Sequence, residues 1–201
     1  MYINKPIREY LDDLAAKSPA PGGGSASALA AAIGVGLMSM AANYTVGNPK
    51  YKQEEKKLAD ILVRASEAKA ELERLVDADV EAYGKLSKAM KELPKNSPEL
   101  DAIYKEAADV PFEICKIAHG MLRICRELAR VGNKNLVTDT AIAAILLEGA
   151  FFSGKYNVYI NLKYIKDMDY VGSVHGILAP LEKTMPKLKE EILEMCEDAI
   201  K

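Results

Sequence analysis

Two aspartates that lie two positions apart, Asp77 and Asp79, are the residues of this sequence best suited to acid–base chemistry. Two positions on an α-helix differ by about 200° of rotation, so the two side chains point to opposite faces. The helical neighbours of Asp77 are charged, namely Glu73, Arg74 and Glu81. The helical neighbours of Asp79 are mostly apolar, namely Leu75, Val76, Ala82 and Tyr83. We therefore expect Asp77 at a solvated surface and Asp79 in a buried position.

A carboxylate on a buried helical face has a raised pKa and needs a partner, which are the usual conditions of a general acid or base. Asp79 is therefore the candidate catalytic residue. The alternative is an aspartate of the core that is tied to a helix end or to a lysine, because structural pairs also perturb pKa values. The residues around Asp79 leave both interpretations open.

Three glycines and a serine, Gly22, Gly23, Gly24 and Ser25, follow the segment Ser18-Pro-Ala-Pro21. This composition predicts a loop, and Ser25 is a suitable N-cap for the helix that follows. Free backbone N–H groups at a helix start form an anion site, and glycines let a ligand approach the backbone. No Gly-Lys-Ser/Thr follows and no strand precedes, which argues against a P-loop or a dinucleotide fingerprint. The alternative is a turn with a cap and no ligand.

A later helix carries Asp139, Asn157 and Asn161, and the first two lie on one side because eighteen residues make about five turns. Asparagine is a poor residue for a helix interior, yet Asn157 and Asn161 stand among large apolar residues. Buried amides need partners, which are a neighbouring helix, a second subunit or the amide edge of a ligand. Asp139 can instead favour the first turn of its helix.

Neither a metal site nor a nucleophilic triad is indicated. His119 and His175 have no second His or Cys at the spacing of metal ligands, so we expect no metal. Three cysteines, Cys115, Cys125 and Cys196, are odd in number and lie in helical, partly apolar contexts. They are predicted to be reduced thiols that pack in the core.

The elements that position these residues are predicted to be helices, because apolar residues recur with helical period and no long stretch alternates with period two. We expect helices over 7–16, 25–46, 50–93, 98–131 and 135–166, with Asn135 as the cap of the last. The segment 170–200 is expected to be helical in its final part and interrupted by Pro180 and Pro186. The fold class is therefore all-α, an up-and-down bundle of five to six long helices in one domain, 1–201.

The composition excludes several classes of protein. The 201 residues are 49% hydrophobic and 28% charged with a net charge of -2, which gives no reason to expect a nucleic-acid partner. The first ten residues lack an apolar signal region, so we expect a cytoplasmic protein. The segment from Ser18 to Pro49 has no charge and is long enough to span a membrane. Its small residues instead favour a buried helix with close backbone packing.

Four motifs together resemble the cyclodeaminase/cyclohydrolase family. They are Pro19-Ala-Pro-Gly-Gly-Gly-Ser25, Leu75-Val-Asp-Ala-Asp-Val-Glu-Ala-Tyr83, Gly132-Asn-Lys-Asn-Leu-Val-Thr-Asp139 and Tyr156-Asn-Val-Tyr-Ile-Asn-Leu162. The resemblance implies an all-helical homodimer that binds folate in a groove near the subunit contact. It also implies a functional role for Asp79, which is followed by Ala82 and Tyr83 as in the family pattern. The predicted pocket walls are Gly22, Gly23, Gly24, Ser25, Tyr83, Asn133, Asp139, Asn157 and Asn161.

The family resemblance implies one of two reactions at the one-carbon bridge of tetrahydrofolate. A cyclohydrolase adds water to 5,10-methenyltetrahydrofolate and yields 10-formyltetrahydrofolate, whereas a cyclodeaminase closes a 5-formimino group onto N10 and expels ammonia. One carboxylate serves either reaction without a metal or redox cofactor. We favour the cyclohydrolase, because the 201 residues include no formiminotransferase domain. The resemblance implies a small-molecule folate substrate, in mono- or polyglutamylated form. The rival interpretation is a helical dimer that binds folate or acts as a scaffold without catalysis.

Overall fold

The computed structural model describes residues 1–201, and all of its regular elements are helical. The six α-helices are α1 (Ile7–Ala15), α2 (Gly23–Asn43), α3 (Glu55–Glu92), α4 (Pro98–Val131), α5 (Val137–Leu162) and α6 (Met168–Ile200). Short 3-10 segments cover Tyr2–Asn4, Pro49–Glu54 and Lys134–Leu136. The predicted all-α class is confirmed.

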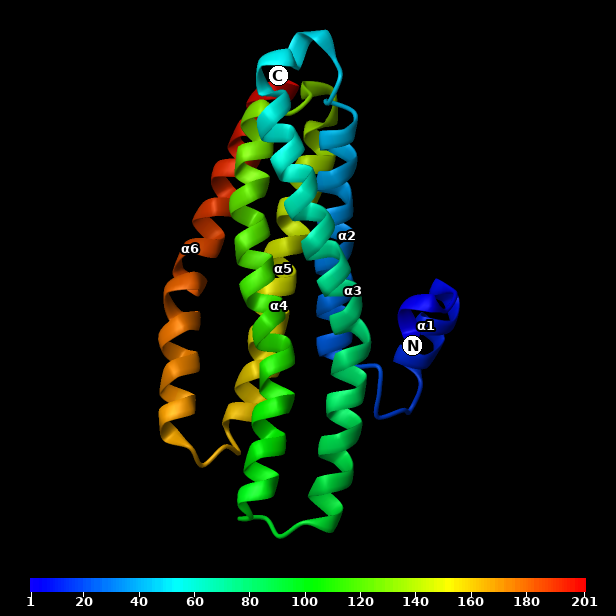
Figure 1. Ribbon diagram of the computed structural model, residues 1–201, viewed down its shortest axis with the longest axis vertical. Coiled ribbons are helices and arrows are strands. Elements are labelled where there is room, and N and C mark those ends of the chain that lie inside the picture. Colours follow the sequence, from blue (N-terminus) through cyan, green and yellow to red (C-terminus); the bar gives the residue numbers. More distant parts are fainter.

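Four antiparallel helices form the centre of the bundle (Figure 1). Each packs on the next around a ring, α2 on α3, α3 on α4, α4 on α5 and α5 on α2. The last helix, α6, lies against α4 and α5 at the side of the bundle away from α2, and α1 lies beside the bundle near its middle. Consecutive long helices run in opposite directions, so the up-and-down topology is also confirmed.

The helix start follows the sequence signals at α4 but not at α2. The Ser97 hydroxyl accepts from the N–H of Leu100, with Pro98 as the first residue of α4. The prediction that Ser25 caps α2 is wrong, because α2 begins at Gly23 and has Gly22 as a cap without a side chain. The Ser25 hydroxyl instead accepts a hydrogen bond from the Tyr10 hydroxyl at 3.1 Å. This contact fastens α1 to the start of α2.

The turn before α5 also differs from the sequence prediction. Asn135 does not cap α5, which has Leu136 at its cap position without a side-chain hydrogen bond. Asn133 instead caps the 3-10 segment Lys134–Leu136, and its side chain accepts from the N–H of Asn135 at 3.0 Å. The turn is further fixed by the Asn133 N–H, which donates to the Thr45 hydroxyl at the end of α2. The polar residues of this turn therefore close the end of the bundle.

The predicted interruption of the last helix is wrong, because α6 continues through both Pro180 and Pro186. Each internal proline costs roughly 3 kcal/mol. Burial of a large aliphatic side chain stabilises by roughly 1.5–3 kcal/mol, and α6 buries several on both sides of the prolines. They are Val174, Leu178, Met185, Leu188 and Ile192. Packing of α6 against α4 and α5 therefore outweighs the tendency of the two prolines to break the helix.

The expectation of a solvated Asp77 is wrong as well. Its side chain is buried, with 6% of the residue exposed, and its carboxylate accepts from the backbone N–H groups of Tyr2 and Ile3. The N-terminal segment covers this face of α3. Helical periodicity describes one helix at a time, so it carries no information about a segment that folds over it from 75 positions away.

Two segments, Gly23–Asn43 and Lys134–Leu162, are long and apolar enough by length and composition to cross a membrane. In the most apolar window of each segment, 56% of the first and 39% of the second is buried in the protein. The expectation of a buried α2 therefore holds for one face only. Large apolar side chains stay exposed, among them Ile33 on α2 and Ile142, Ile145 and Ile160 on α5.

Close packing of α4 on α5 depends on Gly154, where an added Cβ would lie 3.0 Å from Cys115 Sγ and 3.2 Å from the Pro111 carbonyl. We expect Gly154→Leu to lower the free energy of unfolding by about 2–3 kcal/mol through overpacking. Gly120→Leu is the control, because a Cβ there meets nothing within 4 Å. Urea denaturation measures both, and equal effects of the two substitutions would contradict this packing.

Candidate active site

A cavity of about 360 Å³ opens where the start of α2 meets the middle of α3, the first half of α4 and the end of α5. Seven of the predicted site residues line it, namely Gly22, Gly23, Gly24, Asp79, Tyr83, Asn157 and Asn161. The rest of its wall is largely apolar, and no Lys, Arg or His side chain lines it. One carboxylate therefore carries the only formal charge of this cavity.

The Asp79 carboxylate replaces the missing cap of α2. Its Oδ2 accepts from the backbone N–H of Ser25, the third residue of α2, at 2.9 Å. A capping side chain normally accepts from this same position, but Gly22 has none. The carboxylate also lies at the positive end of the α2 dipole. The alternative of an aspartate tied to a helix end is thus realised in the structure, and the same carboxylate lines the cavity.

Opposing effects act on the pKa of Asp79. Burial raises the pKa, and the hydrogen bond from Ser25 lowers it by a smaller amount, so the net pKa lies above the ordinary value of 3.8. No cation lines the cavity to favour the charged form. A carboxyl group with a raised pKa takes up a proton more readily than an ordinary aspartate does.

The three glycines of the loop have different roles. A Cβ at Gly24 would lie 1.9 Å from Asp79 Oδ1, so no other residue fits there while the carboxylate keeps its position. A Cβ at Gly23 would lie 3.3 Å from Asn157 Nδ2, and at Gly22 it would meet nothing within 4 Å. None of the three has a positive φ. Close approach of α2 to α3, not a turn conformation, therefore explains Gly24.

The two asparagines of α5 combine structural and lining positions. Asn161 Nδ2 donates to the Ala107 carbonyl of α4 at 3.1 Å and to the Asn157 carbonyl at 3.0 Å. Asn157 Nδ2 donates to the Ser153 carbonyl at 2.9 Å. Their amide oxygens accept no hydrogen bond within the protein, and both residues line the cavity. Asn161 therefore links α5 to α4, as one of the expected roles required. The side-chain oxygens of Asn157 and Asn161 remain free to accept from a ligand.

Two tyrosines that the sequence analysis missed form an aromatic wall of the cavity. The rings of Tyr104 on α4 and Tyr164 after α5 are stacked, with centroids 5.3 Å apart and planes at 20°. Helical periodicity could not relate these tyrosines to Asp79, because Asp79 lies on α3 and neither tyrosine belongs to that helix. The one available signal was the apolar face of α4, on which Tyr104 lies.

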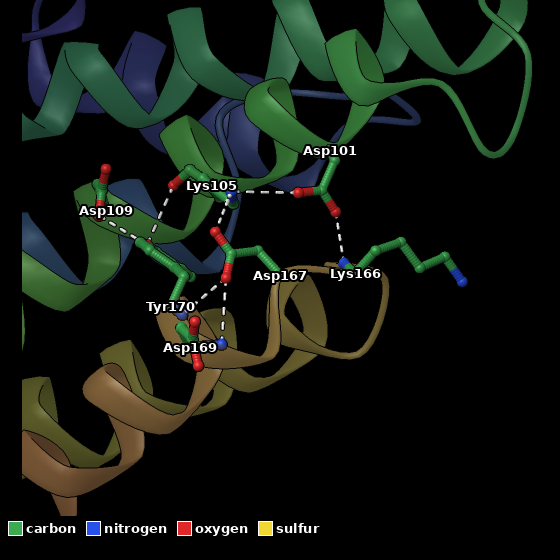
Figure 2. Close-up of polar contacts among 7 residues, drawn as sticks. All are labelled: Asp101, Lys105, Asp109, Lys166, Asp167, Asp169 and Tyr170. Carbon is green, nitrogen blue, oxygen red and sulfur yellow. Dashed lines mark hydrogen bonds and ion pairs between the residues drawn. The ribbon is translucent and has the colours of Figure 1, made fainter.

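A polar cluster holds the turn that carries Tyr164 (Figure 2). Lys105 Nζ contacts Asp167 at 2.8 Å and Asp101 at 3.2 Å, and Asp101 also accepts from the Lys166 N–H. The Tyr170 hydroxyl donates to Asp109 at 2.7 Å. The cluster joins α4 to the start of α6, so the α5–α6 turn between them is fixed beside the cavity.

Asn133 and Asp139 do not line the cavity. They lie at the other end of α5, and about 20 residues of helix separate them from Asn157 and Asn161, roughly 30 Å along the axis. Ser25 is not among the lining residues either, although its N–H reaches Asp79. The site that one chain forms thus unites most, but not all, of the predicted residues.

The thiols and imidazoles lie outside this site. Cys115, Cys125 and Cys196 are buried and unpaired, and burial raises the pKa of Cys115 to about 12, as expected for packing thiols. No three His, Cys, Asp or Glu side chains are grouped so that they could hold a metal ion. The structure is thus an all-α bundle in which one carboxylate lines a largely apolar cavity.

Comparisons with known proteins identify the family. A family model described as formiminotransferase-cyclodeaminase matches residues 6–179. A methenyltetrahydrofolate cyclohydrolase of Methylorubrum extorquens is 31% identical over 188 residues, which cover 88% of this chain and 90% of that protein. The crystal structure of a formiminotetrahydrofolate cyclodeaminase from Thermotoga maritima matches with a TM-score of 0.93 and 31% identity, covering 100% of both chains. The chain therefore belongs to the formiminotransferase-cyclodeaminase family, as its motifs predicted.

A longer relative matches over only part of its length. The formimidoyltransferase-cyclodeaminase of Sus scrofa is 32% identical over 187 residues, which cover 89% of this chain and 34% of the relative. This chain thus corresponds to about a third of that protein.

The raised pKa of Asp79 has a consequence for stability. The unfolded chain releases this proton at lower pH than the folded protein, so the folded state loses stability as the pH rises from about 3.8 through the raised pKa. We expect Asp79→Asn to raise the melting temperature at pH 7, because asparagine stays neutral and still accepts from Ser25. This gain in melting temperature should vanish at a pH below 3.8, where the wild-type Asp79 is protonated in both the folded and the unfolded state.

Asp77→Asn is the matched control, because the Asp77 carboxylate uses both oxygens to accept backbone N–H groups and asparagine offers only one. We expect this variant to melt at a lower temperature than the wild type at pH 7. Calorimetry across the pH range measures both effects. A lower melting temperature of Asp79→Asn at pH 7 would contradict this account. It would show that the hydrogen bond from the Ser25 N–H stabilises the charged carboxylate by more than burial destabilises it.

Proposed function

We propose that this protein hydrolyses 5,10-methenyltetrahydrofolate to 10-formyltetrahydrofolate, with Asp79 as the general acid and base. The supporting observation is a carboxylate with a raised pKa in an otherwise uncharged, largely apolar cavity. Similarity to the cyclohydrolase of Methylorubrum extorquens along 90% of its length favours this reaction.

In the proposed mechanism, Asp79 takes a proton from water while the oxygen of that water bonds to the methenyl carbon between N5 and N10. The tetrahedral intermediate then collapses. Asp79 returns the proton to N5 as the bond between the carbon and N5 breaks, and the remaining hydroxyl proton leaves to solvent. The formyl group stays on N10, so one water is consumed and one proton is released. Such a positioned carboxyl group contributes about 10²–10⁴ in rate.

The proposed substrate suits the groups around Asp79. The N–H groups of Gly23 and Gly24 donate no hydrogen bond within the protein, so they are free to bind a carbonyl oxygen of the ligand. The amide oxygens of Asn157 and Asn161 can accept from ring N–H groups, and Tyr104 and Tyr164 offer flat apolar surface. The cavity volume lies at the lower end for small-molecule sites, enough for the pterin end of a folate.

Closure of a 5-formimino group with release of ammonia is the second candidate, and the match to the Thermotoga maritima cyclodeaminase favours it. Its tetrahedral intermediate would use the same carboxyl group to protonate the leaving nitrogen. Separate assays with methenyl- and formimino-tetrahydrofolate distinguish the two reactions.

We further propose that the protein is a cytoplasmic homodimer whose contact is an uncharged stripe on α5. Seven exposed residues recur at spacings of three and four along this helix: Thr138, Ile142, Ile145, Gly149, Ser153, Tyr156 and Ile160. Exposed Ile33 extends the apolar surface onto α2. Such a continuous apolar face on a soluble protein indicates a partner.

A twofold axis through the middle of this stripe would pair two α5 helices in antiparallel fashion. Gly149 lies at the midpoint between Thr138 and Ile160, and a Cβ there meets nothing within 4 Å, so the helices can approach closely. This pairing brings the Asp139 end of one helix toward the Asn157 end of its partner. Asn133 and Asp139 of one protomer would then contribute to the cavity of its partner, as their predicted pocket role requires. It also covers the apolar surface without a membrane.

The role of Asp79 is tested by comparing it with Asp77. We expect Asp79→Asn to lower kcat/KM for methenyltetrahydrofolate hydrolysis on the order of 10²-fold or more, because no other carboxyl, imidazole or amine group lines the cavity. Asp77→Asn should stay within a few fold, since Asp77 holds the N-terminal segment outside the cavity. The same loss in both variants would refute the assignment, and full activity of Asp79→Asn would favour a non-catalytic role.

The dimer is tested by placing a charge at the centre of the stripe. We expect wild type to be a dimer in light scattering at micromolar concentration and Gly149→Arg to be a folded monomer, because a buried unpaired arginine is costly. Gly176→Arg on α6 is the control, since that glycine is also exposed and open but lies off the stripe. A monomeric wild type, or a dimeric Gly149→Arg, would overturn this interface.

A further inference from the structure

A second cavity of about 440 Å³ lies between α4 and α6, away from the site of Asp79. We name it the α4–α6 groove. Its lining residues are His119, Arg123, Arg126, Pro180, Leu181, Thr184, Lys187, Leu188 and Glu191. The three from α4 follow at spacings of four and three, so one face of that helix supplies them. Positive charge thus gathers in a groove of a protein whose net charge is -2.

The cations of the α4–α6 groove are only partly neutralised. Arg123 and Lys187 form no ion pair with any acidic residue of the chain. Arg126 pairs with Glu191 through Nη1 at 3.0 Å, but its Nε is buried without any hydrogen-bond partner. A buried N–H that lacks a partner is costly, so the ion pair with Glu191 does not satisfy this guanidinium in full. Three cations against the single Glu191 leave two positive charges.

His119 adds an oriented ring to this groove. His119 Nε2 forms a hydrogen bond with the Thr184 hydroxyl at 2.9 Å, and this hydroxyl also lies 2.9 Å from the Leu181 carbonyl. These contacts hold the imidazole ring in the groove, where its signals can report a bound ligand. Burial and the nearby Arg123 lower the pKa of His119, which keeps the ring neutral while the groove is empty.

We propose that the α4–α6 groove binds a small-molecule phosphate dianion, either inorganic phosphate or the phosphate group of a metabolite. Arginine forks match the oxygens of phosphate and lysine adds a point charge. Phosphate esters carry about −1.5 to −2 charges at pH 7, which matches the two uncompensated positive charges. The groove is also larger than one phosphate group needs, so an organic phosphate fits better than the free ion.

The binding test uses the two histidines of the chain as NMR reporters. Titration of the purified protein with inorganic phosphate should shift the ring signals of His119 and saturate. His175, which packs on Tyr159 with centroids 5.2 Å apart, should not respond. Chloride at equal ionic strength is the control for screening. Absence of a saturable His119 shift overturns the proposal.

Three variants give opposite or null effects. Arg123→Gln should weaken phosphate binding about tenfold or more, because a hydrogen bond to a charged group is lost. Glu191→Gln should tighten it several-fold, because the competing carboxylate is removed and Arg126 is freed. Arg64→Gln on α3 removes the same charge far from the groove and should change nothing. Equal weakening by Arg123→Gln and Arg64→Gln would show a general charge effect and overturn the site.

The ligand class is tested with two further probes. Glycerol phosphate should bind more tightly than inorganic phosphate, whereas succinate, a dianion without a phosphate group, should bind more weakly than both. Succinate that binds as tightly as glycerol phosphate would overturn the phosphate assignment. None of these measurements uses folate turnover, so their outcome is independent of the proposed reaction at Asp79.

Discussion

The arrangement of this protein depends on one carboxylate at the open end of one helix. The cap position of α2 is a glycine, and Asp79 of α3 supplies the missing acceptor for the Ser25 N–H. The approach is so close that only glycine fits at position 24 while the Asp79 carboxylate keeps its position. The start of α2, the middle of α3 and the glycine loop therefore form one unit, and the cavity opens beside it.

The remaining helices surround the Asp79 carboxylate without placing a cation beside it. The lining from α4 and α5 is apolar, aromatic or amide, so no cation lowers the pKa of Asp79 and burial keeps it raised. The raised pKa means that ionisation of this carboxyl group costs stability as the pH rises. Cations gather instead on the far side of α4, in the α4–α6 groove. One helix thus separates two sites of opposite electrostatic character.

Helical periodicity predicted the bundle and the bounds of α4, because both follow from residues within one helix. It did not rank the two aspartates correctly, because Asp79 is half-buried and Asp77 is buried. Contacts between distant segments could not be predicted in this way. Asp77 is buried by a backbone 75 positions earlier, and Tyr104 meets Tyr164 only through the fold. Pro180 breaks a local rule that packing overrides in α6. The family motifs added the function, which periodicity alone does not reach.

The most direct test of the central claim is the kcat/KM of Gly24→Ala for methenyltetrahydrofolate hydrolysis. The added methyl group occupies the place of Asp79 Oδ1, and the flexible carboxylate can turn away, so the protein should fold and lose activity on the order of 10²-fold. Gly22→Ala, where the space is open, should remain active. A folded Gly24→Ala with wild-type activity would contradict the claim that this carboxylate, held against α2, performs the chemistry.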